Sequence, residues 1–245
     1  MTYTEYGRTL INNEQALIVL PKRWKWDGAG KLVLWCHGVG GNTLEARRVD
    51  GGRIHTMIII DRLVEELGVG VISAHFGGNQ WGNDVAMSRI DGVLEHAEQH
   101  VGADTSKIGL WGHSMGHLNF MNWTQRNRSR VACVMSAMGT PDLDYSYSRE
   151  SNTAGIDRAY GGEFTPTDSA ERNPSINTSQ KFNGLPWLGF YGTTDTACPV
   201  SYGEKLAEGI GSTARLEVVP GGHSYGTVGE YDQGLIVDHF GTHLL

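Results

Sequence analysis

The sequence predicts an α/β fold, in which helices cover both faces of a mostly parallel, doubly wound central sheet. Short apolar runs alternate with helical patterns along the 245 residues, which is typical of strand-helix-strand units. Runs such as 31–36 (KLVLWC) and 131–138 (VACVMSAM) are almost continuously apolar, as in strands buried on both faces. Glycine-rich segments at 37–41, 112–116 and 221–223 each follow a predicted strand. They should therefore meet at the carboxyl edge of the sheet, where such folds bind ligands.

The individual elements are predicted from apolar periodicity and from the residues that end each run. We expect strands over 16–24, 31–36, 69–74, 108–111, 131–138, 185–192 and 214–219, and helices over 54–67, 85–101, 115–125, 200–209 and 227–239. Gly68 should end the first of these helices, and Asp84 should cap the second. We expect residues 1–245 to form one domain, because a single α/β domain often reaches this length.

Residues 139–184 differ in character from the rest of the chain. Ser, Thr, Asn, Asp, Arg and Tyr dominate this segment, and it has no clear helical or strand period. A polar segment of this length inside a compact domain is unusual and often covers a functional site. We expect a short, lid-like polar insertion over the site. The alternative is a loosely ordered insertion on the surface.

A candidate nucleophile lies in residues 107–119 (KIGLWGHSMGHLN). A short apolar strand leads directly into Gly112-His113-Ser114-Met115-Gly116, and a helix-compatible run follows. A G-x-S-x-G turn in this setting holds the serine in a strained backbone conformation, and its glycines avoid collisions with the neighbouring strand and helix. The helix N-terminus beneath the hydroxyl favours developing negative charge. We therefore expect Ser114 to be a nucleophile.

The same pattern occurs again at 222–226 (GHSYG), so in a chain with 34 glycines the pattern alone is weak evidence. Pro220 and two glycines separate this copy from the preceding strand, which predicts a loop, and few residues after Ser224 remain to supply a base and an acid. Context therefore favours Ser114 over Ser224.

A serine hydroxyl needs a base to take its proton and a group that orients the base. His223 is the predicted base, because it follows a late strand and two glycines and because histidine titrates near neutral pH. Asp195 is the predicted orienting carboxylate, since it comes shortly after the apolar run LGFY at 188–191. Asp142 is the alternative acid, although the turn it opens explains it equally well.

The negative charge that forms on an attacked carbonyl oxygen requires preorganised donors. The backbone N–H of Met115, directly after the candidate nucleophile, is one. The second is expected in the glycine-rich loop at 37–41, from Val39 or its neighbour Gly40.

Together these motifs resemble the α/β-hydrolase superfamily, in its serine esterase and lipase branch. The resemblance rests on Cys36-His37-Gly38 after an early strand, GHSMG, an aspartate after a later strand and a final Gly-Gly-His, and it spans residues 16–240. It implies a hydrolase with a catalytic triad, a nucleophile elbow and an oxyanion hole, but no particular substrate. His117 departs from the pattern, because many members have glycine there. Packing under the turn, or access to the pocket, should therefore differ.

Composition argues against several classes of partner. A net charge of −7 without long runs of Lys or Arg argues against nucleic acid and anionic membranes. No apolar stretch approaches the ~20 residues that span a membrane. The start MTYTEYGRTL lacks a secretory signal, so we expect a cytoplasmic protein, with release or carriage on a larger particle as the alternative. The three distant cysteines predict no disulfide framework, and the scattered histidines predict neither a metal nor another cofactor.

The predicted substrate is a small-molecule ester that is small or polar, with a carbohydrate-like alcohol or an aryl group, because the insertion is polar. The residues expected to contact it are His37, Gly38, Gly40, Phe76, Trp81, His113 and Tyr145. Two other functions stay open. One is an amidase or peptidase of the same fold, and the other is a non-catalytic binding or structural component of a larger particle.

Overall fold

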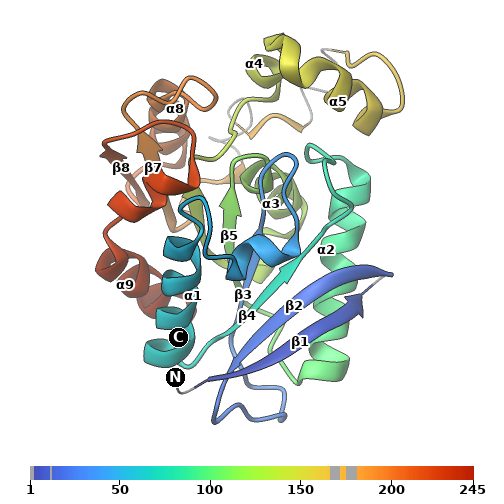
Figure 1. Ribbon diagram of the computed structural model, residues 1–245, viewed down its shortest axis with the longest axis vertical. Helices are drawn as coiled ribbons and strands as arrows, with labels where there is room; N and C mark the ends of the chain where they lie inside the picture. Colours follow the sequence, from blue (N-terminus) through green and yellow to red (C-terminus); the bar gives the residue numbers. More distant parts are fainter. Residues whose placement is uncertain (1–2, 12, 166–171, 175–180) are drawn as a thin grey trace.

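The computed structural model describes residues 3–11, 13–165, 172–174 and 181–245, and it is built around an eight-stranded sheet (Figure 1). The strands are β1 Tyr3–Ile11, β2 Glu14–Pro21, β3 Leu32–Cys36, β4 Gly70–Ala74, β5 Ile108–His113, β6 Val131–Ala137, β7 Trp187–Gly192 and β8 Ala214–Val219. They are arranged in the order β1-β2-β4-β3-β5-β6-β7-β8. Strands β3 to β8 run parallel, whereas β2 is antiparallel to both β1 and β4. The predicted α/β fold with a mostly parallel sheet is confirmed.

The hairpin at one edge of the sheet differs from the prediction. The sequence predicted one strand over 16–24, whereas β2 ends at Pro21 and pairs with the unpredicted β1. Polar residues and a glycine interrupt the apolar residues of β1 (YTEYGRTLI), so it lacks the pattern of a buried strand. Asn13 lies in the turn between the two strands with φ of 62°, a conformation that asparagine tolerates better than most residues.

Helices cover both faces of the sheet (Figure 1). On one face lie α2 Asp84–His96, α3 Met115–Asn127 and α8 Val200–Ile210, and on the other lie α1 Ile54–Leu67 and α9 Gln233–Leu244. Successive strand residues point into opposite cores: Leu34 packs in the first, and Val33 and Trp35 pack in the second. Helix α1 has the predicted bounds and ends at Gly68, whose φ is 71°.

The start of α2 corrects one prediction. Asn83, rather than Asp84, caps this helix, because its side chain accepts hydrogen bonds from the N–H groups of Val85 and Ala86. An N-cap residue must have extended backbone while its side chain reaches forward by two or three residues, and Asn83 has this geometry. Asp84 is instead the first residue of the helix.

The C-terminal helix also differs from its prediction over 227–239. A short 3₁₀ helix, η4 Tyr225–Glu230, precedes α9, which begins after Asp232 and is capped by its carboxylate. The other short helical turns are η1 Thr43–Arg47, η2 Ala97–Val101 and η3 Arg128–Arg130. No helix in the described part of the chain is long and apolar enough to cross a membrane.

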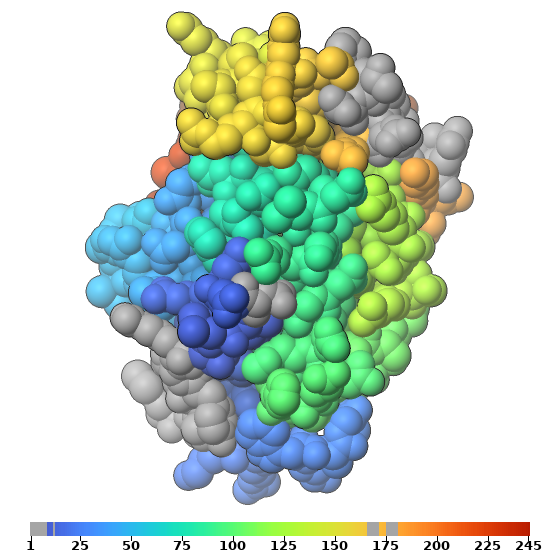
Figure 2. Space-filling view, turned by 90° about the vertical axis from the view of Figure 1, so that its right-hand side faces the viewer, coloured from blue at the N-terminus to red at the C-terminus, as the bar shows by residue number. Residues whose placement is uncertain are grey.

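The part of the polar segment 139–184 that precedes residue 166 contains two helices that its sequence did not predict, α4 Leu143–Ser148 and α5 Glu150–Tyr160. They have few apolar residues, but Leu143 and Ile156 are buried in a small separate core with Trp81 and Phe164. Short helices with so few buried residues give no clear period. Both helices lie beyond the carboxyl edge of the sheet, and in Figure 2 the yellow atoms of this segment form one end of the molecule. Residues 166–171 and 175–180 of the predicted insertion lie outside the described residues.

Candidate active site

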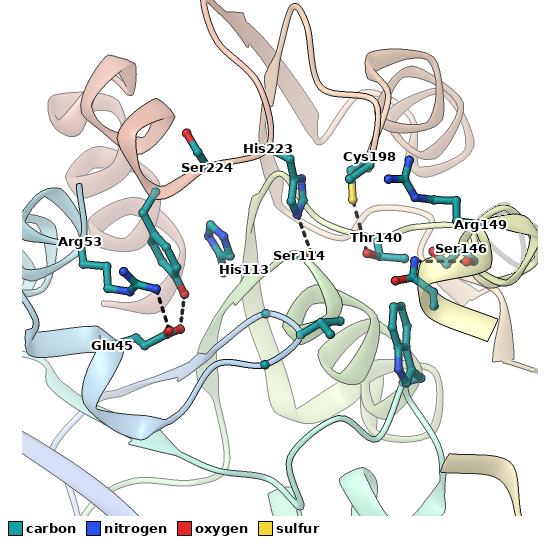
Figure 3. A pocket seen from close by; sticks show the side chains of 17 residues that line it. Glu45, Arg53, His113, Ser114, Thr140, Ser146, Arg149, Cys198, His223 and Ser224 are labelled. Atoms are coloured by element: carbon teal, nitrogen blue, oxygen red, sulfur yellow. Dashed lines mark hydrogen bonds and ion pairs between the residues drawn. The ribbon is translucent and has the colours of Figure 1, made fainter. Parts of the chain in front are cut away.

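Three side chains from distant parts of the chain form one hydrogen-bonded row. His223 Nε2 lies 2.9 Å from Ser114 Oγ, as Figure 3 shows. His223 Nδ1 lies 2.7 Å from Asp195 Oδ2. Ser114 follows β5, Asp195 follows β7 and His223 follows β8, so parallel strands bring all three to one edge. The alternative acid Asp142 lies elsewhere: it caps α4 through the N–H of Tyr145.

The turn that carries Ser114 is strained in the way the sequence predicted. Ser114 has φ of 51° and ψ of −120°, outside the regions that ordinary residues occupy. A Cβ atom on Gly112 would lie 2.3 Å from His117 Cα, and one on Gly116 would lie 2.4 Å from the Cys36 carbonyl oxygen. Both glycines are therefore required where strand, turn and helix meet.

Asp195 is itself held in place by its surroundings. Its side chain is fully buried, and Oδ1 accepts hydrogen bonds from the N–H groups of Ala197 and Cys198, both at 2.8 Å. This leaves Oδ2 for His223. Burial lowers the pKa of His223, but its hydrogen bonds with Asp195 and Cys198 outweigh burial and raise the pKa to about 10. The carboxylate thus holds Nδ1–H toward itself and stabilises the imidazolium.

Two backbone N–H groups near Ser114 are free to point at a ligand. Met115 is the first residue of α3, so its N–H has no partner within the helix. In the loop after β3, the N–H of Gly40 donates to Asn79 Oδ1 and that of Gly41 donates to the Gly38 carbonyl. Among the described residues, the N–H of Val39 has no such partner. Val39 therefore fits the second donor position better than Gly40 does.

His37 supports this loop from beneath. His37 Nδ1 lies 2.8 Å from the Gly38 carbonyl oxygen, and its Nε2 lies 3.2 Å from both the His75 carbonyl oxygen and His75 Nδ1. A neutral imidazole carries one N–H, so it donates to one of these two carbonyls, and the Gly38 carbonyl is the nearer. The His37 and His75 rings stack. Burial lowers the pKa of His37, which keeps the ring neutral.

A cavity of about 290 Å³ opens above Ser114. Of the residues predicted to contact substrate, Gly38, Gly40, Trp81 and His113 line it, as does Val39. The remaining predicted contacts, His37, Phe76 and Tyr145, do not belong to its lining.

The physical reasons differ for these three. His37 is fully buried under its loop, and Phe76 is fully buried against Phe120. The Tyr145 hydroxyl turns away to donate to the Thr196 carbonyl at 2.8 Å. Sequence placed each of them in a loop at the correct edge, but the direction of a loop side chain depends on neighbours that are distant in sequence.

One wall of the cavity is a buried polar network that the sequence analysis missed. The Glu45 carboxylate, only 4% exposed, accepts hydrogen bonds from Arg53 Nη2 at 3.1 Å and from the Tyr225 hydroxyl at 2.5 Å. The Arg53 guanidinium lies over the Tyr225 ring, which in turn stacks on His113 with centroids 4.3 Å apart. Burial and Glu45 raise the pKa of Tyr225, so it remains a donor. The buried carboxylate is tolerated because it is paired.

His117, the departure from the superfamily pattern, is buried beneath the turn. Its Nε2 accepts a hydrogen bond from Trp187 Nε1 at 3.2 Å, and its Nδ1 faces the Thr140 carbonyl. Burial lowers its pKa to about 4, so the ring is neutral. Gly139 makes room for the ring, since a Cβ atom there would lie 2.5 Å from His117 Cγ. The His117 ring thus fills the space under the turn.

His113 and His117 are four residues apart on the chain, but they do not form a ligand pair. Burial lowers the pKa of His113 to about 3, and its ring packs on Tyr225, whereas His117 faces Trp187. Within the described residues, no group of three or more His, Cys, Asp or Glu side chains could hold a metal ion. All three cysteines are buried, free thiols, and Cys198 lines the cavity.

The model of the prolyl oligopeptidase family matches residues 73–227, a span that is more than half of the chain and includes Ser114, Asp195 and His223. The chain belongs to the prolyl oligopeptidase family. It is therefore a serine hydrolase of the α/β-hydrolase superfamily, and the predicted superfamily is confirmed. A search of the curated proteins gave no match.

Solved structures support the same fold across the whole chain. The fluorophosphonate-binding serine hydrolase F of Staphylococcus aureus is 14% identical with a TM-score of 0.74, covering 99% of this chain and 97% of its own. An S-formylglutathione hydrolase from Agrobacterium tumefaciens is 13% identical with a TM-score of 0.73, covering 99% and 95% respectively. A prolyl endopeptidase is 15% identical with a TM-score of 0.72, and the match covers 99% of this chain but only 39% of the endopeptidase. At this level of identity, the similarity identifies the fold alone.

Proposed function

We propose that this serine hydrolase cleaves carboxylic esters through an acyl-enzyme intermediate on Ser114. The observation that carries the proposal is the continuous row of hydrogen bonds from Ser114 Oγ through His223 to Asp195 at the floor of an open cavity. In this scheme His223 Nε2 takes the proton as Ser114 Oγ attacks the ester carbonyl. Asp195 holds the imidazole in the required tautomer and stabilises its charged form.

The proton then moves from His223 to the leaving alcohol as the C–O bond breaks. Water then enters and attacks the acyl carbonyl carbon as it gives a proton to His223 Nε2. His223 passes this proton to Ser114 Oγ as the bond from Oγ to the acyl carbon breaks, and the carboxylic acid departs. The oxyanion of both tetrahedral intermediates would accept hydrogen bonds from the N–H groups of Met115 and Val39. In known enzymes each such donor lowers the barrier by about 2.7–4 kcal/mol.

The cavity favours a small or polar ester. Its volume of about 290 Å³ lies at the low end for small-molecule sites, and much of its lining is polar. An aryl group could lie against Trp81, while the hydroxyls of a carbohydrate-like alcohol could bind Ser146, Asn152 or Thr140, which also line the cavity. We propose that the segment 139–184 acts as the lid of this cavity, since it contributes Thr140, Ser146, Arg149 and Asn152 to the lining.

An amidase or peptidase is the second candidate, and the family match favours it. Amide cleavage uses the same three residues but demands stronger proton donation from His223 to the leaving amine. The two functions are separated by the ratio of kcat/KM for an ester and the amide of the same acyl group. A higher kcat/KM for the amide than for the ester would identify the protein as an amidase.

The direct test is hydrolysis of short-chain chromogenic esters by the wild-type protein and by Ser114→Ala. We expect turnover by the wild type and a loss of about 10⁶-fold in kcat for the variant. Ser224→Ala is the comparison variant, because this serine lies in the second copy of the motif. It also lines the cavity, but its hydroxyl faces Thr227 and forms no hydrogen bond with His223 in the described structure, so kcat should fall far less than for Ser114→Ala. Equal activity of wild type and Ser114→Ala would defeat the mechanism.

Covalent labelling addresses the non-catalytic alternative. A fluorophosphonate probe should label Ser114 in the wild type and leave Ser114→Ala unlabelled, as read by intact-protein and peptide mass spectrometry. Absence of labelling, together with absence of ester and amide turnover, would favour a binding or structural component instead.

A further inference from the structure

The charged side chains in and directly behind the cavity wall are not evenly compensated. Glu45 is paired with Arg53 at one end, and the carboxylate of Asp195 is paired with His223 above Ser114. Arg149 lies at the other end, and it forms no ion pair with a carboxylate in the described part of the chain. The lining thus carries one cation whose charge nothing in the described structure neutralises.

The position of Arg149 is well defined. It is the residue between α4 and α5, so the ends of both helices fix its backbone. Nearby, the Ser146 hydroxyl donates to the Asp142 carbonyl and the Asn152 amide donates to the Ser146 carbonyl, which hold this corner together. Figure 3 shows the Arg149 guanidinium directed back toward the cavity beside Cys198.

Among the described residues, the Arg149 side chain uses little of its hydrogen-bonding capacity. Its Nη1 donates to the Thr196 carbonyl, which is a neutral acceptor. A guanidinium has five N–H groups in a planar fork, so several donors remain for a ligand. Such a fork matches a carboxylate, whose two oxygens can accept two parallel hydrogen bonds.

We propose that the natural ester carries a carboxylate, on its acyl or its alcohol part, that binds Arg149 when the ester carbonyl lies at Ser114. The inference rests on the proposed ester hydrolysis and names the substrate class of that same site. The overall charge of −7 repels anions in general, so a preference for an anionic ester must come from a local cation. Arg149 is a specificity-determining residue in this proposal, not a catalytic one.

The test compares two pairs of esters that differ only in charge. In the first pair the acyl part changes: mono(4-nitrophenyl) adipate and its methyl ester, both followed by release of nitrophenolate. In the second pair the alcohol part changes: 4-acetoxyphenylacetate and its methyl ester, both followed by release of the phenol. The readout is the ratio of kcat/KM for the charged over the neutral member of each pair.

We expect the wild type to prefer the charged member of one pair, and Arg149→Gln to lower that ratio about tenfold, as for the loss of a charge-assisted hydrogen bond. Arg149→Lys should retain part of the preference. Arg158→Gln is the matched control, because it removes the same charge from the exposed end of α5 and Arg158 does not line the cavity. Its ratio should equal that of the wild type.

If Arg149 only held the segment in place through its hydrogen bond to Thr196, Arg149→Gln would change kcat/KM equally for both esters of a pair. The ratio of the two kcat/KM values would then stay unchanged. That result in both pairs overturns the inference while leaving the esterase proposal intact. The wild type also supplies a test that needs no variant: raising the salt concentration should lower the ratio, since screening weakens an ion pair at a partly open site. If the wild type cleaves no member of either pair, the proposed function fails first.

Discussion

The edge where β5, β7 and β8 end and the segment 139–184 contribute to the same cavity by different means. At the strand ends, the fully buried β5 and β7 and the partly exposed β8 hold short turns in which a Cβ atom on Gly112, Gly116 or Gly192 would collide with backbone atoms. In the segment, two short helices rest on a small apolar cluster that they share with Trp81 and with Met115 and Leu118 of α3, apart from the two main cores. The strand ends thus hold the reactive groups in place, whereas the segment contributes residues that contact the substrate. Substitutions in the segment should cost less folding stability than substitutions at the strand ends.

The largest expected effect separates the two aspartates. Asp195→Asn should reduce kcat by about 10⁴-fold, because an amide donates to Nδ1 and holds His223 in the wrong tautomer. Asp142→Asn should change kcat by less than about threefold, since asparagine caps a helix as well as aspartate does. Steady-state kinetics on one chromogenic ester provide both values. A large loss for Asp142→Asn with little change for Asp195→Asn would reverse the assignment.

The two regions should also respond differently to an added methyl group. Gly116→Ala should lower the free energy of unfolding by about 3 kcal/mol, because its Cβ would lie 2.4 Å from a backbone carbonyl that cannot move away. Gly162, beyond α5, faces open space, so Gly162→Ala should stay within about 0.5 kcal/mol of the wild type. Urea denaturation monitored by tryptophan fluorescence measures both. Equal stabilities would show that the turn relaxes more easily than its contacts imply.

The pH dependence of activity should reflect the Asp195–His223 pair. Only neutral His223 can accept the Ser114 proton, and its hydrogen bonds raise its pKa from the ordinary 6.5. The value of kcat/KM should therefore rise with pH, about tenfold per pH unit, as long as the pH stays below the raised pKa of His223 of about 10. Rates for a neutral ester between pH 5 and 10, corrected for uncatalysed hydrolysis, should rise across most of this range without a plateau. A rise in kcat/KM centred below pH 6.5 would mean that burial lowers the pKa of His223 by more than Asp195 raises it.

Removing a buried apolar side chain should cost less global stability inside the segment than in the sheet. Ile156→Ala should lower the free energy of global unfolding by about 1 kcal/mol or less, while speeding amide hydrogen exchange across α4 and α5, because a satellite core can open locally. Leu110→Ala, in the central strand β5, should cost about 3 kcal/mol globally. Hydrogen exchange by mass spectrometry beside chemical denaturation distinguishes the two. A full global loss for Ile156→Ala would show that the segment is part of the main cooperative unit.

Sequence predicted the strand-end edge well because its signals are local. A continuous apolar run, a glycine turn and a helix start each leave a mark within a few residues, as at β5 and α1. Ser114, His223 and Asp195 were named because each follows such a run. Their roles in catalysis stay predictions that the experiments above address.

The parts that sequence missed depend on contacts between distant positions. Glu45 and Tyr225 are 180 residues apart, and nothing near either predicts that a hydroxyl will donate to a buried carboxylate. Strand β1 has no buried-face pattern of its own and forms because β2 offers an edge. Arg149 looks like an ordinary surface arginine until the two helices on either side of it are in place.

One atom at the junction of the two regions takes part in two hydrogen bonds with the segment. The carbonyl oxygen of Thr196, the residue after Asp195, accepts hydrogen bonds from both the Tyr145 hydroxyl and the Arg149 guanidinium. Any swing of α4 and α5 away from the body must break both bonds at the base of the turn that aims the acid. Opening the cavity and loosening Asp195 would thus be mechanically linked. The hydrogen-bonded row of Ser114, His223 and Asp195 would be fully aligned only when α4 and α5 lie closed over the substrate.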